Sequence, residues 1–180
     1  PGLLAKLAAS VDAMAGGRVR LGLGVGWMED EYRAYGHPFP RAGVRLEQLE
    51  ETIEIVRRLW REPRANFSGR HHSIVDAPAL PKPGRIPVVV GGAGDRLLGL
   101  VARQADEWNC PNPAWREFSA KRDLLRRECE RTVGRINGQF SEPGNVVVHY
   151  FRRSLPRDEL VAYYLAADVM LVTPLRVVPS

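Results

Sequence analysis

The stretch VRLGLGVGW at residues 19–27 decides how the rest of the sequence is interpreted. It places Gly22, Gly24 and Gly26 at every second position of a segment with the apolar pattern of a β-strand. Glycine weakens a strand, because it has no side chain to pack and loses more conformational freedom on folding than other residues. Two interpretations are open: the glycines allow close packing inside a barrel, or they allow a ligand to approach the backbone.

Helical and strand patterns alternate on both sides of this stretch. Apolar residues at helical spacing predict helices at 2–15, 44–61, 97–105 and 113–131. Short apolar runs predict strands at 19–25, 86–90 and 106–110, and a short hairpin within 65–85. Residues 28–43 contain two prolines and two glycines and are expected to form a long ordered loop. This order predicts an α/β fold with a parallel sheet, open or closed into a barrel.

The end of the sequence has the pattern of a separate unit. Residues 134–145 are rich in turn-forming residues and fit a linker or a long connection. Beyond them, a strand pattern, a helix pattern and a second strand pattern follow one another. We therefore expect a first domain over 1–131, a junction over 132–145 and a β-α-β fragment over 146–180.

Charge and composition argue against several classes of protein. The net charge of +5 comes from 26 Lys and Arg against 21 Asp and Glu. These charges are interspersed, which is typical of solvated helix faces and argues against a nucleic-acid partner. No apolar run approaches the roughly 20 residues of a membrane span, and the first residues lack a signal-peptide pattern. We therefore expect a cytoplasmic protein with no membrane partner.

Cysteine and histidine give no support for a metal site. Cys110 and Cys129 have no C-x-x-C spacing, so we expect free structural thiols. His71 and His72 are adjacent and would point in different directions from a strand or a helix, so they cannot readily share one metal ion.

A second glycine-rich motif, GGAGDR at 91–96, lies where a predicted strand ends and a helix begins. Free backbone N–H groups and the helix dipole at such a position can hold a phosphate, to which Arg96 would add positive charge. A plain tight turn is the alternative. The motif lacks the G-K-[ST] of nucleotide hydrolases, and the G-x-G-x-G of the first stretch is not the dinucleotide fingerprint G-x-G-x-x-G.

Four segments carry a resemblance to a known family. They are LAKLAASVDAMAGGRVRLGLGVGWMEDEYRAYGHPFPRAGVRLEQLEETIEIVRRLW, FSGRHHSIVDAPALPKP, IPVVVGGAGDRLLGLVARQADEWN and KRDLLRRECE. Together they make residues 3–131 similar to the luciferase-like monooxygenase family, above all to its deazaflavin-dependent branch. The resemblance implies a TIM barrel that uses coenzyme F-420 or FMN, bound across the carboxyl ends of the strands. The implied reaction is hydride transfer to, or monooxygenation of, a small organic substrate.

The resemblance also implies which residues meet the cofactor. Gly24, Gly26 and Trp27 would lie at the mouth of a barrel strand close to it, and Asp30 would be a polar contact. The family's glycine-rich turn would hold the cofactor's phosphate region through backbone amides. The residues that match this turn are Gly91, Gly92 and Gly94, with Arg96 beside them.

Part of the family's barrel has no counterpart in this sequence. Its first strands and its usual acid/base side chains would precede Pro1, so no catalytic residue is assigned. The expected fold is therefore a partial barrel, in a truncated enzyme. Its unpaired strand edges could pair with another copy of the chain.

Residues 131–176 resemble a different family, trehalose-6-phosphate synthase. The quoted segment is RTVGRINGQFSEPGNVVVHYFRRSLPRDELVAYYLAADVMLVTPLR. Such synthases are nucleotide-sugar glycosyltransferases with Rossmann-like domains, and their sugar-donor residues would follow this segment. Transfer activity is therefore not expected here. The alternatives to an oxidoreductase are a glycosyltransferase fragment and an inactive chimeric polypeptide.

Overall fold

The computed structural model describes residues 1–140. The helices are α1 (Gly2–Met14), α2 (Glu29–Ala34), α3 (Ala42–Arg61), α4 (Asp95–Gln104) and α5 (Phe118–Phe140), with a 3-10 helix η1 (Asn112–Glu117). The strands are β1 (Leu21–Gly24), β2 (Arg64–Ser68), β3 (Ser73–Pro78), β4 (Val88–Gly91) and β5 (Glu107–Asn109). The predicted fragment over 146–180 lies outside the described residues.

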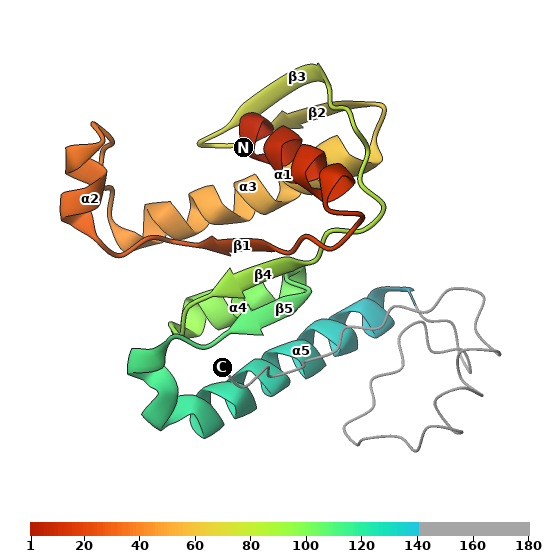
Figure 1. The fold of residues 1–180 in the computed structure, drawn as a ribbon. Helices are drawn as coiled ribbons and strands as arrows, with labels where there is room; N and C mark the ends of the chain where they lie inside the picture. Colours follow the sequence, from red (N-terminus) through yellow and green to blue (C-terminus); the bar gives the residue numbers. More distant parts are fainter. Residues whose placement is uncertain (141–180) are drawn as a thin grey trace.

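Three of the strands form a parallel sheet in the order β1-β4-β5 (Figure 1). Its register pairs Gly24 of β1 with Gly91 of β4, and Gly91 with Asn109 of β5. The last residues of all three strands therefore meet at one edge. The predicted α/β fold with a parallel sheet is confirmed.

The helices connect and cover these strands. α3 and the β2–β3 hairpin lie between β1 and β4 in the sequence, and α4 joins β4 to β5. The hairpin is antiparallel, with Ser68 opposite Ser73, as the sequence predicts. α1 packs against α3, while α5 packs along α4.

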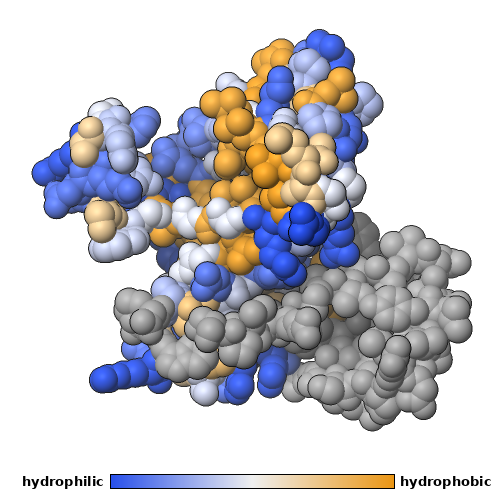
Figure 2. All heavy atoms as spheres, viewed as in Figure 1, coloured by the Kyte–Doolittle hydropathy of each residue, from blue (hydrophilic) through white to orange (hydrophobic). Residues whose placement is uncertain are grey.

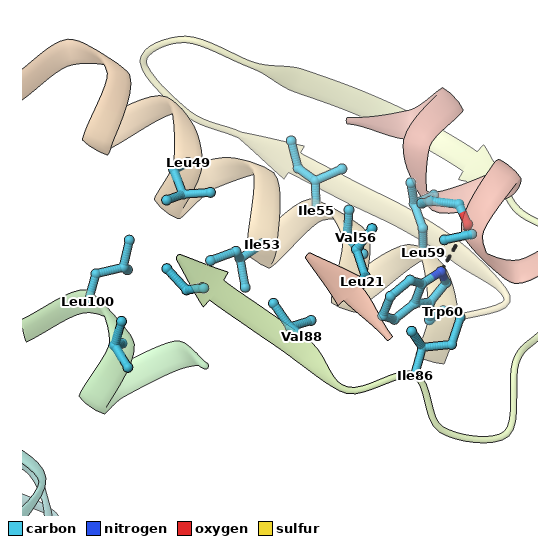
Figure 3. Packing of buried hydrophobic residues seen from close by; sticks show 14 of the residues in the cluster. Leu21, Leu49, Ile53, Ile55, Val56, Leu59, Trp60, Ile86, Val88 and Leu100 are labelled. Atoms are coloured by element: carbon cyan, nitrogen blue, oxygen red, sulfur yellow. Dashed lines mark hydrogen bonds between the residues drawn. The ribbon is translucent and has the colours of Figure 1, made fainter. Parts of the chain in front are cut away.

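The core is centred on α3 and β4 (Figure 3). Ile53, Ile55 and Val56 of α3 are fully buried, as are Val88 and Val90, the alternate residues of β4 that face inward. Burying a side chain of this size contributes about 1.5–3 kcal/mol. The core therefore fixes the helix against the strand that leads into the glycine-rich turn.

A buried polar contact ties α1 to the end of α3. The indole nitrogen of Trp60 donates a hydrogen bond to the carbonyl oxygen of Ala5 at 3.0 Å (Figure 3). This contact satisfies an indole that would otherwise be buried without a partner.

The predicted loop over 28–43 is partly wrong, because it contains helix α2. Three acidic residues fill the first turn of α2, where they interact favourably with the helix dipole. Glu29 and Arg33 form an ion pair at 2.7 Å with helical i,i+4 spacing. The prolines of this stretch, Pro38 and Pro40, both follow the helix and do not interrupt it.

Two other boundaries also differ from the predictions. β1 covers only Leu21–Gly24 of the predicted strand at 19–25. The predicted turn-rich break is wrong for 134–140, because α5 continues through Gly134 and Gly138 to Phe140. A glycine inside a helix costs only about 1 kcal/mol relative to alanine, which neighbouring residues can offset.

Candidate functional site

The two glycine-rich motifs meet at the edge where the parallel strands end. Gly24 and Gly91 are direct partners in the register, and a Cβ atom on Gly24 would lie 3.4 Å from the carbonyl oxygen of Gly91. Gly22, by contrast, would carry a Cβ into open space. The close contact at Gly24 is therefore between two backbones, which brings the predicted site residues of both motifs to one place.

Gly26 lies beyond the strand and makes a turn. Its φ is +74°, in the left-handed region that favours glycine. A Cβ atom there would also lie 2.5 Å from the hydroxyl oxygen of Tyr32. Gly26 therefore lets the chain turn beneath the Tyr32 ring.

Trp27 and Asp30, the other two residues predicted in this motif, lie on the surface. The Trp27 side chain is 80% exposed, which is unusual for the largest apolar side chain. Asp30 is exposed in the first turn of α2. Both residues follow the carboxyl end of β1, so they remain available to a ligand at this edge.

The second motif forms a turn that is held from both sides by β5. The Gly92 N–H donates to the carbonyl oxygen of Asn109 at 3.1 Å, and the Gly92 carbonyl accepts from the Trp108 indole at 2.7 Å. The Gly92 φ is +139°, and a Cβ there would lie 2.2 Å from a methyl carbon of Leu97. Only glycine fits this position without strain.

The turn ends in an open helix N-terminus. Gly94 is the N-cap of α4, no side chain of the described residues caps it, and a Cβ on Gly94 would meet nothing within 4 Å. The first N–H groups of a helix lack partners within the helix, so they can bind an anion. Asp95 would oppose an anion, but its carboxylate is paired with Lys121 at 2.9 Å. The residues present therefore fit a phosphate group.

Arg96 adds a positive charge at the same place. Its side chain is exposed, and one of its terminal nitrogens lies 3.5 Å from the position of a Cβ on Gly43 in the first turn of α3. The structure thus brings together the predicted residues of the second motif, beside the start of α3.

Trp108 and Lys121 were not among the predicted site residues. Trp108 supports the glycine turn, and its ring stacks on Phe118 with centroids 5.7 Å apart. Lys121 neutralises Asp95 from α5. Both contacts span many positions in the sequence, and the one local signal was the position of Trp108 at the end of a predicted strand.

A cavity of about 470 Å³ lies at the opposite end of the helices. Its lining comes from the last turns of α3 and α4 and includes Arg57, Arg58, Arg61 and Arg103. In parallel α/β folds, ligands bind at the carboxyl ends of the strands, whereas this cavity lies toward their other ends. We therefore place the candidate site at the carboxyl ends of the strands, where Gly24 of β1 lies beside Gly91 of β4. We call this end of the sheet the glycine edge.

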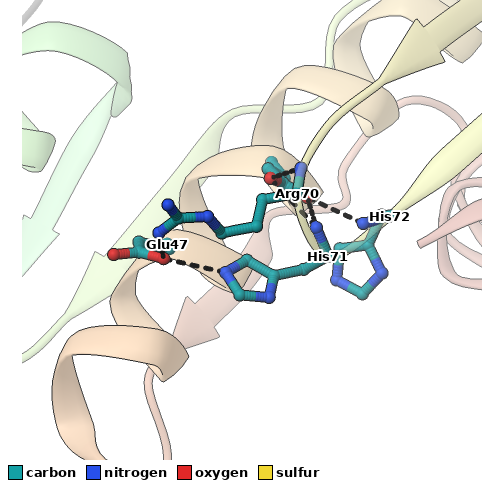
Figure 4. A network of polar contacts seen from close by, with 5 residues as sticks. Glu47, Arg70, His71 and His72 are labelled. Carbon is teal, nitrogen blue, oxygen red and sulfur yellow. Dashed lines mark hydrogen bonds and ion pairs between the residues drawn. The ribbon is translucent and has the colours of Figure 1, made fainter.

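His71 and His72 belong to a network that fastens the hairpin turn to α3 (Figure 4). The Glu51 carboxylate accepts hydrogen bonds from the backbone N–H groups of Arg70, His71 and His72, the shortest at 2.7 Å. Glu47 contacts the His71 ring at 2.8 Å and pairs with Arg70 at 3.3 Å. No group of three metal-ligating side chains occurs within residues 1–140. The observed role of these histidines is structural.

The network predicts a pH dependence of stability. Burial would raise the pKa of Glu51, but the three backbone donors outweigh it and lower the pKa below the ordinary 4.5. A carboxyl group with a lowered pKa in the folded state stabilises the protein above its unfolded pKa, and this stabilisation is lost as the pH falls through the folded pKa. The Glu51→Gln variant should therefore unfold more easily at neutral pH and lose less stability on acidification.

Urea unfolding between about pH 7 and pH 3 measures this difference. Glu31→Gln is the matched control, because Glu31 is exposed on α2 and lies outside the network. A Glu51→Gln variant with the same pH profile as the wild-type protein would contradict the role given to this carboxylate.

Both cysteines are free, as predicted. Burial raises the pKa of the Cys110 thiol. Burial also raises the pKa of Cys129, with further contributions from the negative charges of Glu130 and Glu128. A raised pKa keeps a thiol protonated and unreactive at neutral pH, which fits structural thiols. No helix within residues 1–140 is long and apolar enough to cross a membrane.

Residues 1–148 match the family model described as luciferase-like monooxygenase, which extends past the predicted limit at 131. Among solved structures, an F-420-dependent secondary alcohol dehydrogenase is 24% identical, with a TM-score of 0.62, over 72% of this chain and 41% of that one. The EDTA monooxygenase from Chelativorans sp. BNC1 is 25% identical, with a TM-score of 0.59, over 74% and 38% of the two chains.

A second set of similar proteins consists of trehalose-6-phosphate synthases. The trehalose-6-phosphate synthase of Mycobacterium leprae is 62% identical over 53 residues, and that of Mycobacterium tuberculosis is 56% identical over 61 residues. These matches cover 29% and 34% of this chain. The chain spans only 11% and 12% of the length of these synthases, and about two fifths of the solved structures. Both predicted resemblances are confirmed.

Proposed function

Because the chain belongs to the luciferase-like monooxygenase family, we propose that it binds coenzyme F-420 or FMN at the edge where β1, β4 and β5 end. The ligand's phosphate region binds the turn formed by Gly91, Gly92 and Gly94, with Arg96 beside it. The ring system lies toward Gly24, Gly26, Trp27 and Asp30. The observation that carries this proposal is the open, uncapped N-terminus of α4 at Gly94.

The proposed activity is hydride transfer to, or monooxygenation of, a small organic substrate. The bound cofactor supplies the redox chemistry, whereas the protein binds and orients it. Gly24 and Gly91 leave the strand ends without side chains, so the ring can approach the backbone there. Neighbours of similar fold include an F-420-dependent alcohol dehydrogenase, which supports coenzyme F-420, and a monooxygenase, which supports the second proposed reaction; FMN is a candidate through the family resemblance.

A Gly94→Asp variant tests the proposal. Aspartate is a favourable N-cap residue, and the Gly94 backbone is extended with open space around it, so the fold should keep its stability. The added carboxylate would repel the phosphate. Two unit charges about 4 Å apart near a protein surface interact by about 4 kcal/mol, so the dissociation constant should rise at least about tenfold. Fluorescence titration with each cofactor measures this change.

Gly94→Asn is the matched control, because asparagine has the same shape and capping ability without the charge. An asparagine cap occupies some of the same free N–H groups, so we expect the affinity of this variant to fall, but less than that of Gly94→Asp; the difference between the two variants reports the added charge. Equal losses in the two variants would point to capping or crowding instead of charge, and an unchanged affinity in Gly94→Asp would place the phosphate elsewhere. A folded wild-type protein that binds neither cofactor would overturn the proposal.

Sugar transfer is the second candidate function, because of the high identity to trehalose-6-phosphate synthases. The matched piece is only about a tenth of a synthase, so we do not expect it to bind a sugar donor. The same titration with a uridine-diphosphate sugar distinguishes the two functions. Saturable binding of that ligand would favour the glycosyltransferase interpretation.

We also propose that two copies of the chain associate through the outer side of β1, the strand at one side of the sheet. Within residues 1–140, β1 is hydrogen-bonded only to β4 and leaves one edge unpaired. Exposed apolar side chains gather on α1, the helix before β1. They are Leu3, Leu7, Val11 and Met14. Figure 2 shows apolar residues gathered in the upper part of the face in view, the part where Figure 1 places α1. An unpaired edge beside an apolar helix face is a typical association surface.

A further inference from the structure

A single arginine holds both ends of the segment that follows β1. Arg45 lies in the first turns of α3. Its Nε donates a hydrogen bond to the carbonyl oxygen of Val25 at 3.0 Å, and one terminal nitrogen donates to the carbonyl oxygen of Pro40. Val25 directly follows β1, and Pro40 directly precedes the N-cap of α3. The guanidinium therefore binds both ends of the segment that connects β1 to α3.

Aromatic contacts continue from this guanidinium into the segment. Arg45 lies over the Phe39 ring at 3.8 Å from its centroid. The Phe39 ring meets Tyr32 edge to face, with centroids 5.0 Å apart. The Tyr32 hydroxyl in turn lies against Gly26, where a Cβ atom would be only 2.5 Å away. An unbroken series of contacts therefore runs from Arg45 to Gly26.

We propose that Arg45 is a positioning residue for the cofactor site. It fixes the path of residues 26–39, which include Gly26, Trp27 and Asp30, next to the glycine-rich turn. The turn's Arg96 lies beside Gly43, two positions before Arg45, so both halves of the site lie beside the start of α3. This inference rests on the proposed function.

The forked shape of arginine is essential to this role. Two carbonyl oxygens and one ring face are engaged by a single planar group, which a lysine ammonium cannot reproduce. Arg45→Met removes the side-chain hydrogen bonds and the charge, whereas Arg45→Lys keeps the charge and an N–H donor group but loses the planar fork. We expect Arg45→Met to weaken binding of FMN or coenzyme F-420 at least about tenfold, and Arg45→Lys to recover little of it.

Arg58 provides a matched control on the same helix. It also lies near an aromatic ring, Phe67 at 5.5 Å, and donates to a backbone carbonyl, that of Asn66 at 2.9 Å. It does so near the other end of α3, away from the glycine edge. Arg58→Met should therefore leave cofactor affinity within about twofold of the wild-type value.

Two measurements on the full chain test the inference. Amide hydrogen exchange without cofactor reports whether residues 26–39 open faster in Arg45→Met than in Arg58→Met. Fluorescence titration with FMN and with coenzyme F-420 reports the affinity. Faster exchange confined to 26–39 together with weaker binding is the expected result.

Other outcomes would overturn the inference. Unchanged exchange would show that Arg45 does not hold the segment, and unchanged affinity despite faster exchange would show that the segment does not serve the site. If the wild-type protein binds neither cofactor, the proposed function fails and the positioning role fails with it. If the wild-type protein and Arg45→Met bind with equal affinity, the positioning role fails alone.

Discussion

Replacing Gly92 with alanine is expected to lower the free energy of unfolding by about 2–4 kcal/mol. The Gly92 φ of +139° is in a region that residues with a Cβ rarely adopt. The new Cβ would also lie 2.2 Å from a methyl carbon of Leu97, which is 6% exposed and has little room to move. Backbone strain and overpacking therefore act together at one position.

The same substitution should distort the proposed phosphate site, because Gly92 is bonded to β5 through both its N–H and its carbonyl. Urea unfolding followed by circular dichroism measures the loss of stability. Gly94→Ala is the control: two positions away, its backbone is extended and its Cβ would meet no atom within 4 Å. Comparable stability of the two variants would show that the turn can relax around Leu97.

Truncating Ile53 to alanine is expected to cost about 2–5 kcal/mol of stability. Ile53 is fully buried in the core cluster, on the face of α3 that covers β4. Removal of three carbons leaves a cavity in a close-packed interior, and the surrounding residues collapse into it only in part. The loss is large compared with the 5–15 kcal/mol total that is typical of a domain, so a fraction of the protein would unfold at moderate temperature.

Thermal and urea unfolding of Ile53→Ala and Ile53→Val measure this effect as a series. Valine removes a single carbon, so its expected cost is about 0.5–1.5 kcal/mol. A loss below about 1 kcal/mol for Ile53→Ala would indicate that α3 is less tightly packed on the sheet than the structure shows.

Local patterns predicted the regular part of this fold. The helix that spans Ala42–Arg61 has a long apolar stripe, and Val88–Gly91 belongs to a continuous apolar run, so each could be recognised without knowledge of its partners. The hairpin was also predicted. Helix α2 was missed because prolines and glycines nearby masked a short segment stabilised by its charges.

Local patterns predicted the candidate site only as two separate motifs, and the family resemblance alone implied that both meet one cofactor. That Gly24 and Gly91 are partners depends on how β1 pairs with β4, which a local pattern does not specify. The support from Arg45 and Trp108 likewise depends on contacts made by the assembled fold. The Gly94 and Arg45 variants test the proposed assignment of these residues to a cofactor.

Arg45 holds the segment after β1 mainly by its backbone, at the carbonyl groups of Val25 and Pro40. A hydrogen bond to a carbonyl group does not depend on the identity of the side chain at that position. Surface residues between the two anchors that have no part in the proposed site, such as the exposed Tyr35, can therefore be exchanged while the path of the chain is preserved. Such side chains can change during evolution without rebuilding the scaffold that presents them.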